Sequence, residues 1–136
     1  MFAAREDRQN PATGDMEKIN LAEKFALFDE TWTPKIVGEL NGQYIKLAKV
    51  EGKMVWHSHA DEDEFFYVVR GEMTIHLRDR DVHLREGEGF IVPRGVEHNP
   101  EAAEVAHVLL FEPKATAHTG TTESDLTVPV ESQERI

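Results

Sequence analysis

The segments HSHADEDEFFYVVRG (57–71) and PRGVEH (93–98) decide the expected fold and chemistry of this chain. They contain three imidazoles and a carboxylate, a typical ligand set for a divalent transition metal. These four groups belong to His57, His59, Glu64 and His98. Because His57 and His59 are two residues apart, both rings project from one face of an extended strand. The sequence therefore predicts that these four residues form a metal site.

The remaining histidines and Arg94 invite separate hypotheses. His76 and His83 lie on polar positions of short strand-like runs, and we expect both to face solvent. His107 shares the strand parity of Leu109, so two readings stay open: it lines the cavity, or it packs elsewhere. Arg94 either meets an anionic ligand at the cavity mouth or is a solvated turn residue.

Composition narrows the class of protein. The chain has 136 residues, which suits one domain, and its net charge of −11 opposes binding to nucleic acid or anionic membranes. It contains no cysteine, so disulfides, thiolate metal ligands and cysteine nucleophiles are excluded. No uncharged apolar run approaches membrane-spanning length. We therefore expect a cytoplasmic protein whose partner is a small molecule.

The pattern of elements indicates an all-β fold with one short N-terminal helix. Apolar residues fall at helical spacing over 20–30, with Asn20 as the N-cap. Short runs separated by turn signals follow, and Asn41-Gly42 is a strong hairpin signal. The predicted strands are 36–40, 43–50, 54–57, 64–69, 73–77, 82–84, 89–92 and 105–111. Their even spacing is typical of an antiparallel sandwich or barrel.

The ends of the chain differ from its centre. Residues 1–15 are polar and contain Asn10-Pro11 and Thr13-Gly14, so we expect a flexible N-terminal arm. Residues 119–136 show little periodicity, which predicts a poorly ordered tail. A single domain at 16–118 remains between them.

The two segments resemble the two motifs of the cupins. The first cupin motif reads G, five residues, H-x-H, three or four residues, E, six residues, G. The chain matches it from Gly52 to Gly71, with a first spacer of four residues. The second motif reads G, five residues, P-x-G, two residues, H, three residues, N. Gly87, Pro93, Gly95 and His98 match it, whereas Ala102 stands where the asparagine would be.

The resemblance covers about 43–113 and implies a double-stranded β-helix, or jelly-roll barrel, with a metal inside. It assigns His57, His59, Glu64 and His98 as the ligands. The surrounding sequence is similar to small single-domain bacterial cupins labelled mannose-6-phosphate isomerase-like, a label that describes the fold and not an activity. Cupins commonly pair barrels through segments that precede the first motif, so we also expect a homodimer.

Several functions fit this site. We expect one divalent transition ion per chain, which could be Fe, Mn, Ni, Co, Cu or Zn. The leading hypothesis is a metal-dependent enzyme acting on a small polar oxygen-bearing metabolite, as a dioxygenase, isomerase, decarboxylase or lyase. No second base stands beside the ligands in the sequence, which favours chemistry carried by the metal. The alternatives are a non-catalytic metal-dependent binding module and a structural cupin dimer.

Overall fold

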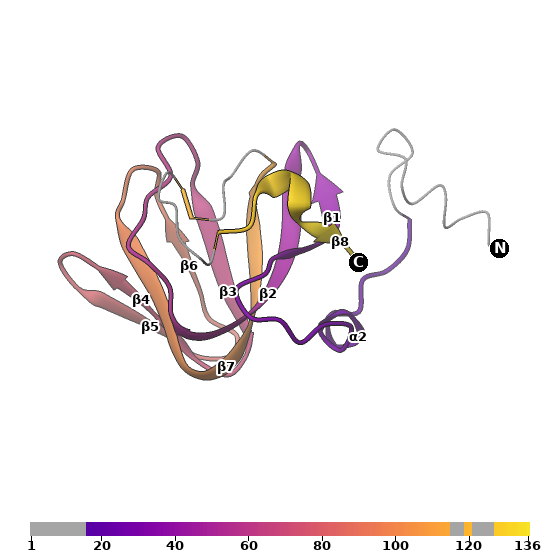
Figure 1. Cartoon of the computed structure of the whole chain (residues 1–136), viewed down its shortest axis with the longest axis horizontal. Coiled ribbons are helices and arrows are strands. Elements are labelled where there is room, and N and C mark those ends of the chain that lie inside the picture. The colour runs from indigo at the N-terminus through magenta and orange to yellow at the C-terminus, as the bar shows by residue number, and fades with distance from the viewer. Residues whose placement is uncertain (1–15, 115–118, 121–126) are drawn as a thin grey trace.

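The longest strand, β7 (His98–Pro113), connects all parts of the sheet in the computed structural model, which describes residues 16–114, 119–120 and 127–136 (Figure 1). Its first residues pair with β4 (Met73–Leu77), which pairs with β5 (Asp81–Leu84). Its later residues lie between β2 (Gln43–Lys53) and β3 (Glu64–Arg70). The outer strands are β1 (Lys35–Leu40) on β2 and β6 (Gly89–Val92) on β3. This arrangement confirms the predicted all-β jelly roll.

The turn-forming residues and the alternation of apolar and polar positions explain most of the strands. Asn41 and Gly42 both have positive φ, 50° and 76°, as the tight hairpin between β1 and β2 requires. The prediction is wrong for 54–57, which is not a strand. This segment meets β7 through a bridge between His57 and His98 and a backbone hydrogen bond from Met54 to Pro100. β7 begins seven residues before the predicted 105, because its polar start is held by pairing with β4.

The N-terminal helix is shorter than predicted. α2 (Leu21–Phe25) spans five residues and not 20–30. Asn20 is the N-cap as expected, and its side chain accepts a hydrogen bond of 3.0 Å from the Glu23 amide. Phe25 and Phe28 are buried in a cluster with Leu47 of β2, so packing on the outside of the sheet replaces further helical turns.

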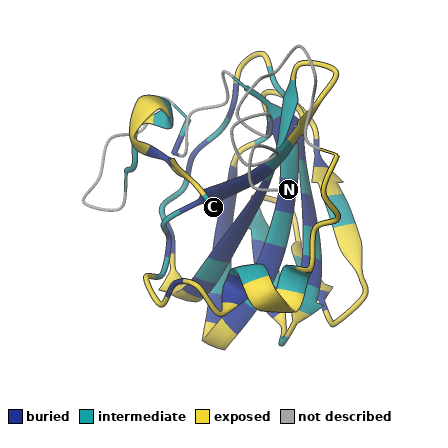
Figure 2. Ribbon diagram, turned by 90° about the vertical axis from the view of Figure 1, so that its right-hand side faces the viewer, coloured by how far each residue is buried: buried dark blue, intermediate teal, exposed yellow. Residues whose placement is uncertain are grey.

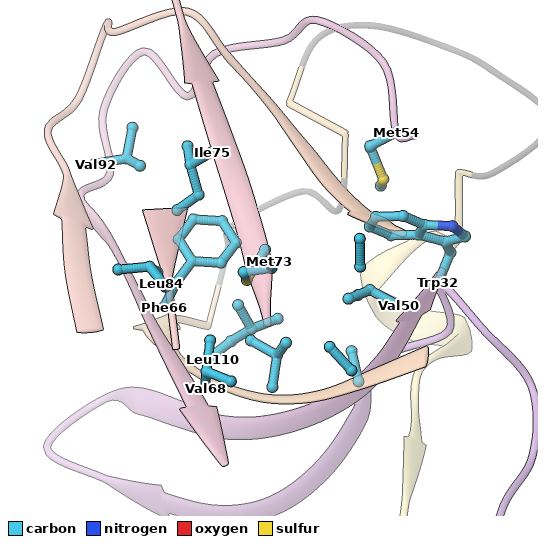
Figure 3. Packing of buried hydrophobic residues seen from close by; sticks show 14 residues of the cluster. Trp32, Val50, Met54, Phe66, Val68, Met73, Ile75, Leu84, Val92 and Leu110 are labelled. Atoms are coloured by element: carbon cyan, nitrogen blue, oxygen red, sulfur yellow. The ribbon is translucent and has the colours of Figure 1, made fainter. Parts of the chain in front are cut away.

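Inward-facing side chains of the strands fill the barrel. The apolar run of β3 could indicate a strand buried on both faces, but the buried Phe66 and Val68 alternate with the half-buried Phe65 and Tyr67, so only one face is fully buried. Figure 2 shows the buried positions concentrated along the strands, and Figure 3 shows the inward cluster. Its labelled members are Trp32, Val50, Met54, Phe66, Val68, Met73, Ile75, Leu84, Val92 and Leu110.

The C-terminal residues 127–136 carry regular structure where the sequence predicts a poorly ordered tail. They include a short 3-10 helix η1 (Val130–Ser132) and strand β8 (Glu134–Arg135), which runs parallel to β1. Periodicity could not reveal β8, because two residues are too few. The predicted arm at 1–15 lies outside the described residues. Among the described helices, none is long and apolar enough to cross a membrane.

Candidate metal centre

The four predicted ligands meet at one point inside the barrel. The backbones of His57 and His98 form an isolated antiparallel β-bridge, with two reciprocal hydrogen bonds of 3.0 and 2.9 Å. His59 lies in the loop before β3, and Glu64 is the first residue of that strand. All four side chains are buried, and one ligand atom from each lies within 4.8 Å of the others. The structure therefore brings together the four residues that the sequence groups as candidate ligands.

Backbone carbonyls fix the tautomers of two of the rings. Nδ1 of His57 lies 2.8 Å from the Val55 carbonyl oxygen, and Nδ1 of His98 lies 2.9 Å from that of Val96. A carbonyl oxygen only accepts, so each Nδ1 carries the proton and donates it. Each Nε2 then carries the lone pair and faces the centre. In metal-binding histidines, a hydrogen bond from the other ring nitrogen generally fixes the tautomer and the orientation of the ring in this way.

The centre contains buried polar atoms that no described protein group satisfies. Nε2 of His59, Nε2 of His98 and Oε1 of Glu64 are buried without a hydrogen-bond partner among the described residues. Glu64 Oε1 lies 3.3 Å from the His59 nitrogen and 3.5 Å from the His98 nitrogen. Ligands bound about 2.1 Å from one ion are separated by about 3 to 4 Å. The residues thus fit a divalent cation, which would satisfy all three atoms.

Electrostatics keeps His57 and Glu64 in metal-binding protonation states. Burial, followed by the nearby His98, lowers the pKa of His57 to about 4, so this ring is neutral at pH 7. Burial raises the pKa of Glu64, but the close His59 and His98 rings and Glu112 outweigh it and hold that pKa well below its usual range. Neutral imidazole and ionised carboxylate are the forms that bind metals.

The second motif holds the loop that carries His59. The Gly95 amide donates a hydrogen bond of 2.7 Å to the His59 carbonyl oxygen, and Gly95 has a φ of 78°. The Arg94 amide donates to Asp63 at 2.9 Å, and the Arg94 side chain pairs with the same carboxylate. Arg94 therefore clamps the acidic loop from an exposed position, in agreement with the turn-residue reading.

A small apolar cavity adjoins the centre. Its volume is about 40 Å³, and His57 and Glu64 form part of its wall. The rest of the wall is apolar and includes Trp32, Val50, Met54, Phe66, Met73 and Leu110. His57 and Glu64 are the ionisable members of this wall in the described part of the chain.

Three further histidines of the described residues, His76, His83 and His107, lie away from the centre. His76 bonds Asp81 at 2.7 Å and Glu101 at 2.6 Å, and these contacts raise its pKa. His83 is exposed, as predicted. His107 stacks on Phe25 at 4.4 Å between ring centroids, beneath the N-terminal segment, so it does not line the cavity.

Two charged residues in the barrel interior were not identified from the sequence. Lys46 and Glu112 lie in the interior, and Lys46 Nζ is 2.9 Å from Glu112 Oε1. Burial and the adjacent Glu64 carboxylate raise the pKa of Glu112 well above its usual range. Strand parity was the available signal, because Glu112 is in phase with the inward-facing Leu110.

Comparisons with known proteins agree with this architecture. The Cupin_2 family, described as a cupin domain, matches residues 43–112. The crystal structure of a cupin-2 domain containing protein from Shewanella frigidimarina is 45% identical, with a TM-score of 0.69, and the match covers 70% of this chain and 93% of that one. Protein SchB of Streptomyces halstedii is 30% identical over 105 residues, covering 71% of this chain and 76% of SchB.

Other relatives are longer than the matched region. The uncharacterized protein YdbB of Bacillus subtilis is 33% identical over 63 residues, covering 46% of this chain and 56% of YdbB. The 3-hydroxyanthranilate 3,4-dioxygenase of Danio rerio is 31% identical over 90 residues, covering 61% of this chain. The match spans 31% of that dioxygenase, so the likeness concerns the barrel and not the whole enzyme.

Proposed function

The chain belongs to the cupin domain family, and from this premise we propose that it is a metal-dependent enzyme of the dioxygenase type that acts on a small molecule. One observation carries the proposal: four buried metal-binding side chains converge beside an apolar cavity. Within the described residues, the ionisable groups on the cavity wall are themselves members of the ligand set. No further side chain there is placed to serve as a separate acid or base.

The composition of that wall favours reactions in which a bound metal supplies the chemistry. A bound divalent metal of the redox-active type supplies activation of dioxygen or of a chelating substrate. An isomerase or lyase that moves protons needs an acid–base group near the substrate. The names of several relatives, 3-hydroxyanthranilate 3,4-dioxygenases, support the dioxygenase choice among the remaining reactions.

The residues of this chain would bind and orient the ligand. The apolar wall around Trp32 and Phe66 holds an apolar part of the ligand and excludes water. His57 and Glu64 mark the polar end, where oxygen atoms of the ligand would face the metal. Because the cavity has a volume of only about 40 Å³, we expect a molecule of few atoms with two neighbouring oxygen groups and at most a small apolar group.

The first test is metal content. Protein purified without added metal, or reloaded with Fe(II), should hold about one ion per chain by elemental analysis. His59→Ala and His98→Ala should each lose most of the metal, whereas the exposed control His83→Ala should keep it. Equal loss in all three variants would contradict the site.

The second test is turnover. Fe(II)-loaded wild type should consume oxygen with at least one member of a panel of small enediols and hydroxy acids. His98→Ala should be inactive and His83→Ala fully active. A loaded protein that binds panel members, by a change in its ligand-field spectrum, without consuming oxygen would favour the alternative of a non-catalytic binding cupin.

A further inference from the structure

Trp32 has the largest side chain on the cavity wall, and it comes from outside the strands that carry the candidate ligands. The cavity has a volume of about 40 Å³, and Trp32 and Pro34 line it together with residues of the barrel. Both residues precede the family match, which begins at residue 43. The candidate ligands therefore lie in the part of the chain that matches the cupin family, whereas this part of the wall comes from the segment before it.

The backbone of Trp32 has an unusual conformation. Its φ of 56° lies in the left-handed region, which bulky residues rarely occupy because the side chain crowds the backbone there. The Trp32 amide donates a hydrogen bond of 2.8 Å to the Lys49 carbonyl oxygen, and the preceding Thr31 forms a parallel bridge with Lys49. Such conformations persist where the surroundings fix them, and they are concentrated at functional sites. Backbone preference alone would favour glycine at this position.

The indole ring of Trp32 is also held in place. Its Nε1–H donates a hydrogen bond of 2.7 Å to the Glu51 carbonyl oxygen, and the residue is only 8% exposed. Figure 3 shows the ring beside Met54 and Val50, with Phe66 on the other side of the cluster. These three residues line the same cavity. Because its nitrogen and its backbone are both bonded to β2, the ring cannot swing away for a longer ligand without losing a buried hydrogen bond.

We propose that Trp32 is the size-determining residue of the centre, and that its indole restricts the ligand to a molecule of few atoms. The inference rests on the proposed function, because a limit on ligand size matters only if the centre binds a small molecule. A 2-hydroxy acid that faces the metal through its carboxylate and hydroxyl oxygens has the apolar wall left for its side chain. Each methylene that such a wall accepts or rejects changes binding by about tenfold or more.

A series of 2-hydroxy acids of increasing chain length measures this limit. Glycolate, lactate, 2-hydroxybutyrate and 2-hydroxyhexanoate are titrated into Co(II)-loaded protein, and the change in the ligand-field spectrum gives each dissociation constant. Wild type should bind glycolate or lactate at least about tenfold more tightly than 2-hydroxyhexanoate. Trp32→Gly removes the ring and suits the positive φ. This variant should bind 2-hydroxyhexanoate at least about tenfold more tightly than wild type does, with glycolate little changed.

Two phenylalanine variants complete the comparison. Trp32→Phe keeps a smaller aromatic ring, so it should bind 2-hydroxybutyrate more tightly than wild type does, and it decides the test if the glycine variant does not fold. Trp56→Phe is the matched control, because Trp56 lies under the Arg78 guanidinium, 3.8 Å from its ring centroid, and is not among the described residues that line the cavity. This control should keep the size preference of wild type.

Three outcomes would overturn the inference. They are a wild type that binds 2-hydroxyhexanoate as tightly as lactate, an unchanged size preference in folded Trp32→Phe, and the same change of preference in Trp56→Phe. If Co(II)-loaded wild type responds to none of the four acids, or takes up no Co(II), the proposed function falls and this inference falls with it. The two failures are distinct, because the first concerns which acids bind and the second concerns whether any acid binds at all.

Discussion

Acid should destabilise the metal-free protein, and His57 should account for a measurable part of the loss. Burial and the adjacent His98 lower the pKa of this ring to about 4 in the folded state. In the unfolded chain the ring has its ordinary pKa of about 6.5. As the pH falls from 6.5 toward 4, the unfolded state therefore binds a proton that the folded state does not. The free energy of unfolding falls over that window and is unaffected by this group above it.

The width of the window sets the size of the effect. At about 1.4 kcal/mol per pH unit, the full displacement corresponds to about 3 kcal/mol. The ring is only 5% exposed, so solvent screening does not reduce this figure much. Between about pH 7 and pH 4.5, some 2 to 2.5 kcal/mol of it should be lost. That is a large share of the roughly 5–15 kcal/mol that stabilises a domain of this size.

Urea unfolding of chelator-treated protein at about pH 7 and pH 4.5 measures the effect, with the fluorescence of Trp32 and Trp56 as the signal. His57→Gln removes the titrating ring, so its loss of stability between the two pH values should be smaller than that of wild type by about 2 kcal/mol. The exposed control His83→Gln should lose as much as wild type. The carboxylates common to all three proteins cancel in the comparison. Equal losses in wild type and His57→Gln would refute the reasoning.

Three further outcomes are expected. Gly89→Ala should destabilise the fold by about 1–3 kcal/mol in a thermal melt, because the added Cβ would lie 2.8 Å from the Phe65 ring and 2.9 Å from the Phe66 carbonyl oxygen; an unchanged melting temperature would contradict this. Deletion of 127–136 removes β8 and also Ile136, which packs on the buried cluster of Phe25, Phe28, Val37 and Leu47. This deletion should also lower the melting temperature. The protein should be a homodimer by light scattering at tens of micromolar, and a monomer mass would exclude that expectation.

The fold was predictable where local signals and burial agree. Asn41-Gly42 specifies its hairpin, a continuous apolar run indicates β3, and alternating apolar residues indicate β4. The start of β7 and the strand β8 were not predictable, because partners distant in sequence stabilise them. The helix was overestimated for a similar reason: Phe28 has helical spacing but is buried against the sheet from an irregular segment.

The convergence of the four candidate ligands was predictable from the sequence, and the surroundings of these residues were not. His57, His59 and Glu64 lie within eight residues of one another, so their spacing can be recognised locally. His98 can be recognised because it closely follows the turn at Pro93. The apolar character of the cavity depends on side chains from several strands and from the segment around Trp32. Such a wall emerges only when the strands are paired, so no local pattern could reveal it.

The interior of the barrel also bears on whether the centre is structural or functional. On β3 and β7 the inward positions are apolar at Phe66, Val68 and Leu110, and they become ionisable at Glu64 and Glu112, where the centre lies. Replacing buried ion pairs by apolar residues is often neutral or stabilising, so stability alone gives no reason to keep them. A closed structural ion would also need no cavity on its wall. The ionisable positions at this level of the barrel and the apolar cavity beside them are therefore the observations that support our proposal of a functional centre.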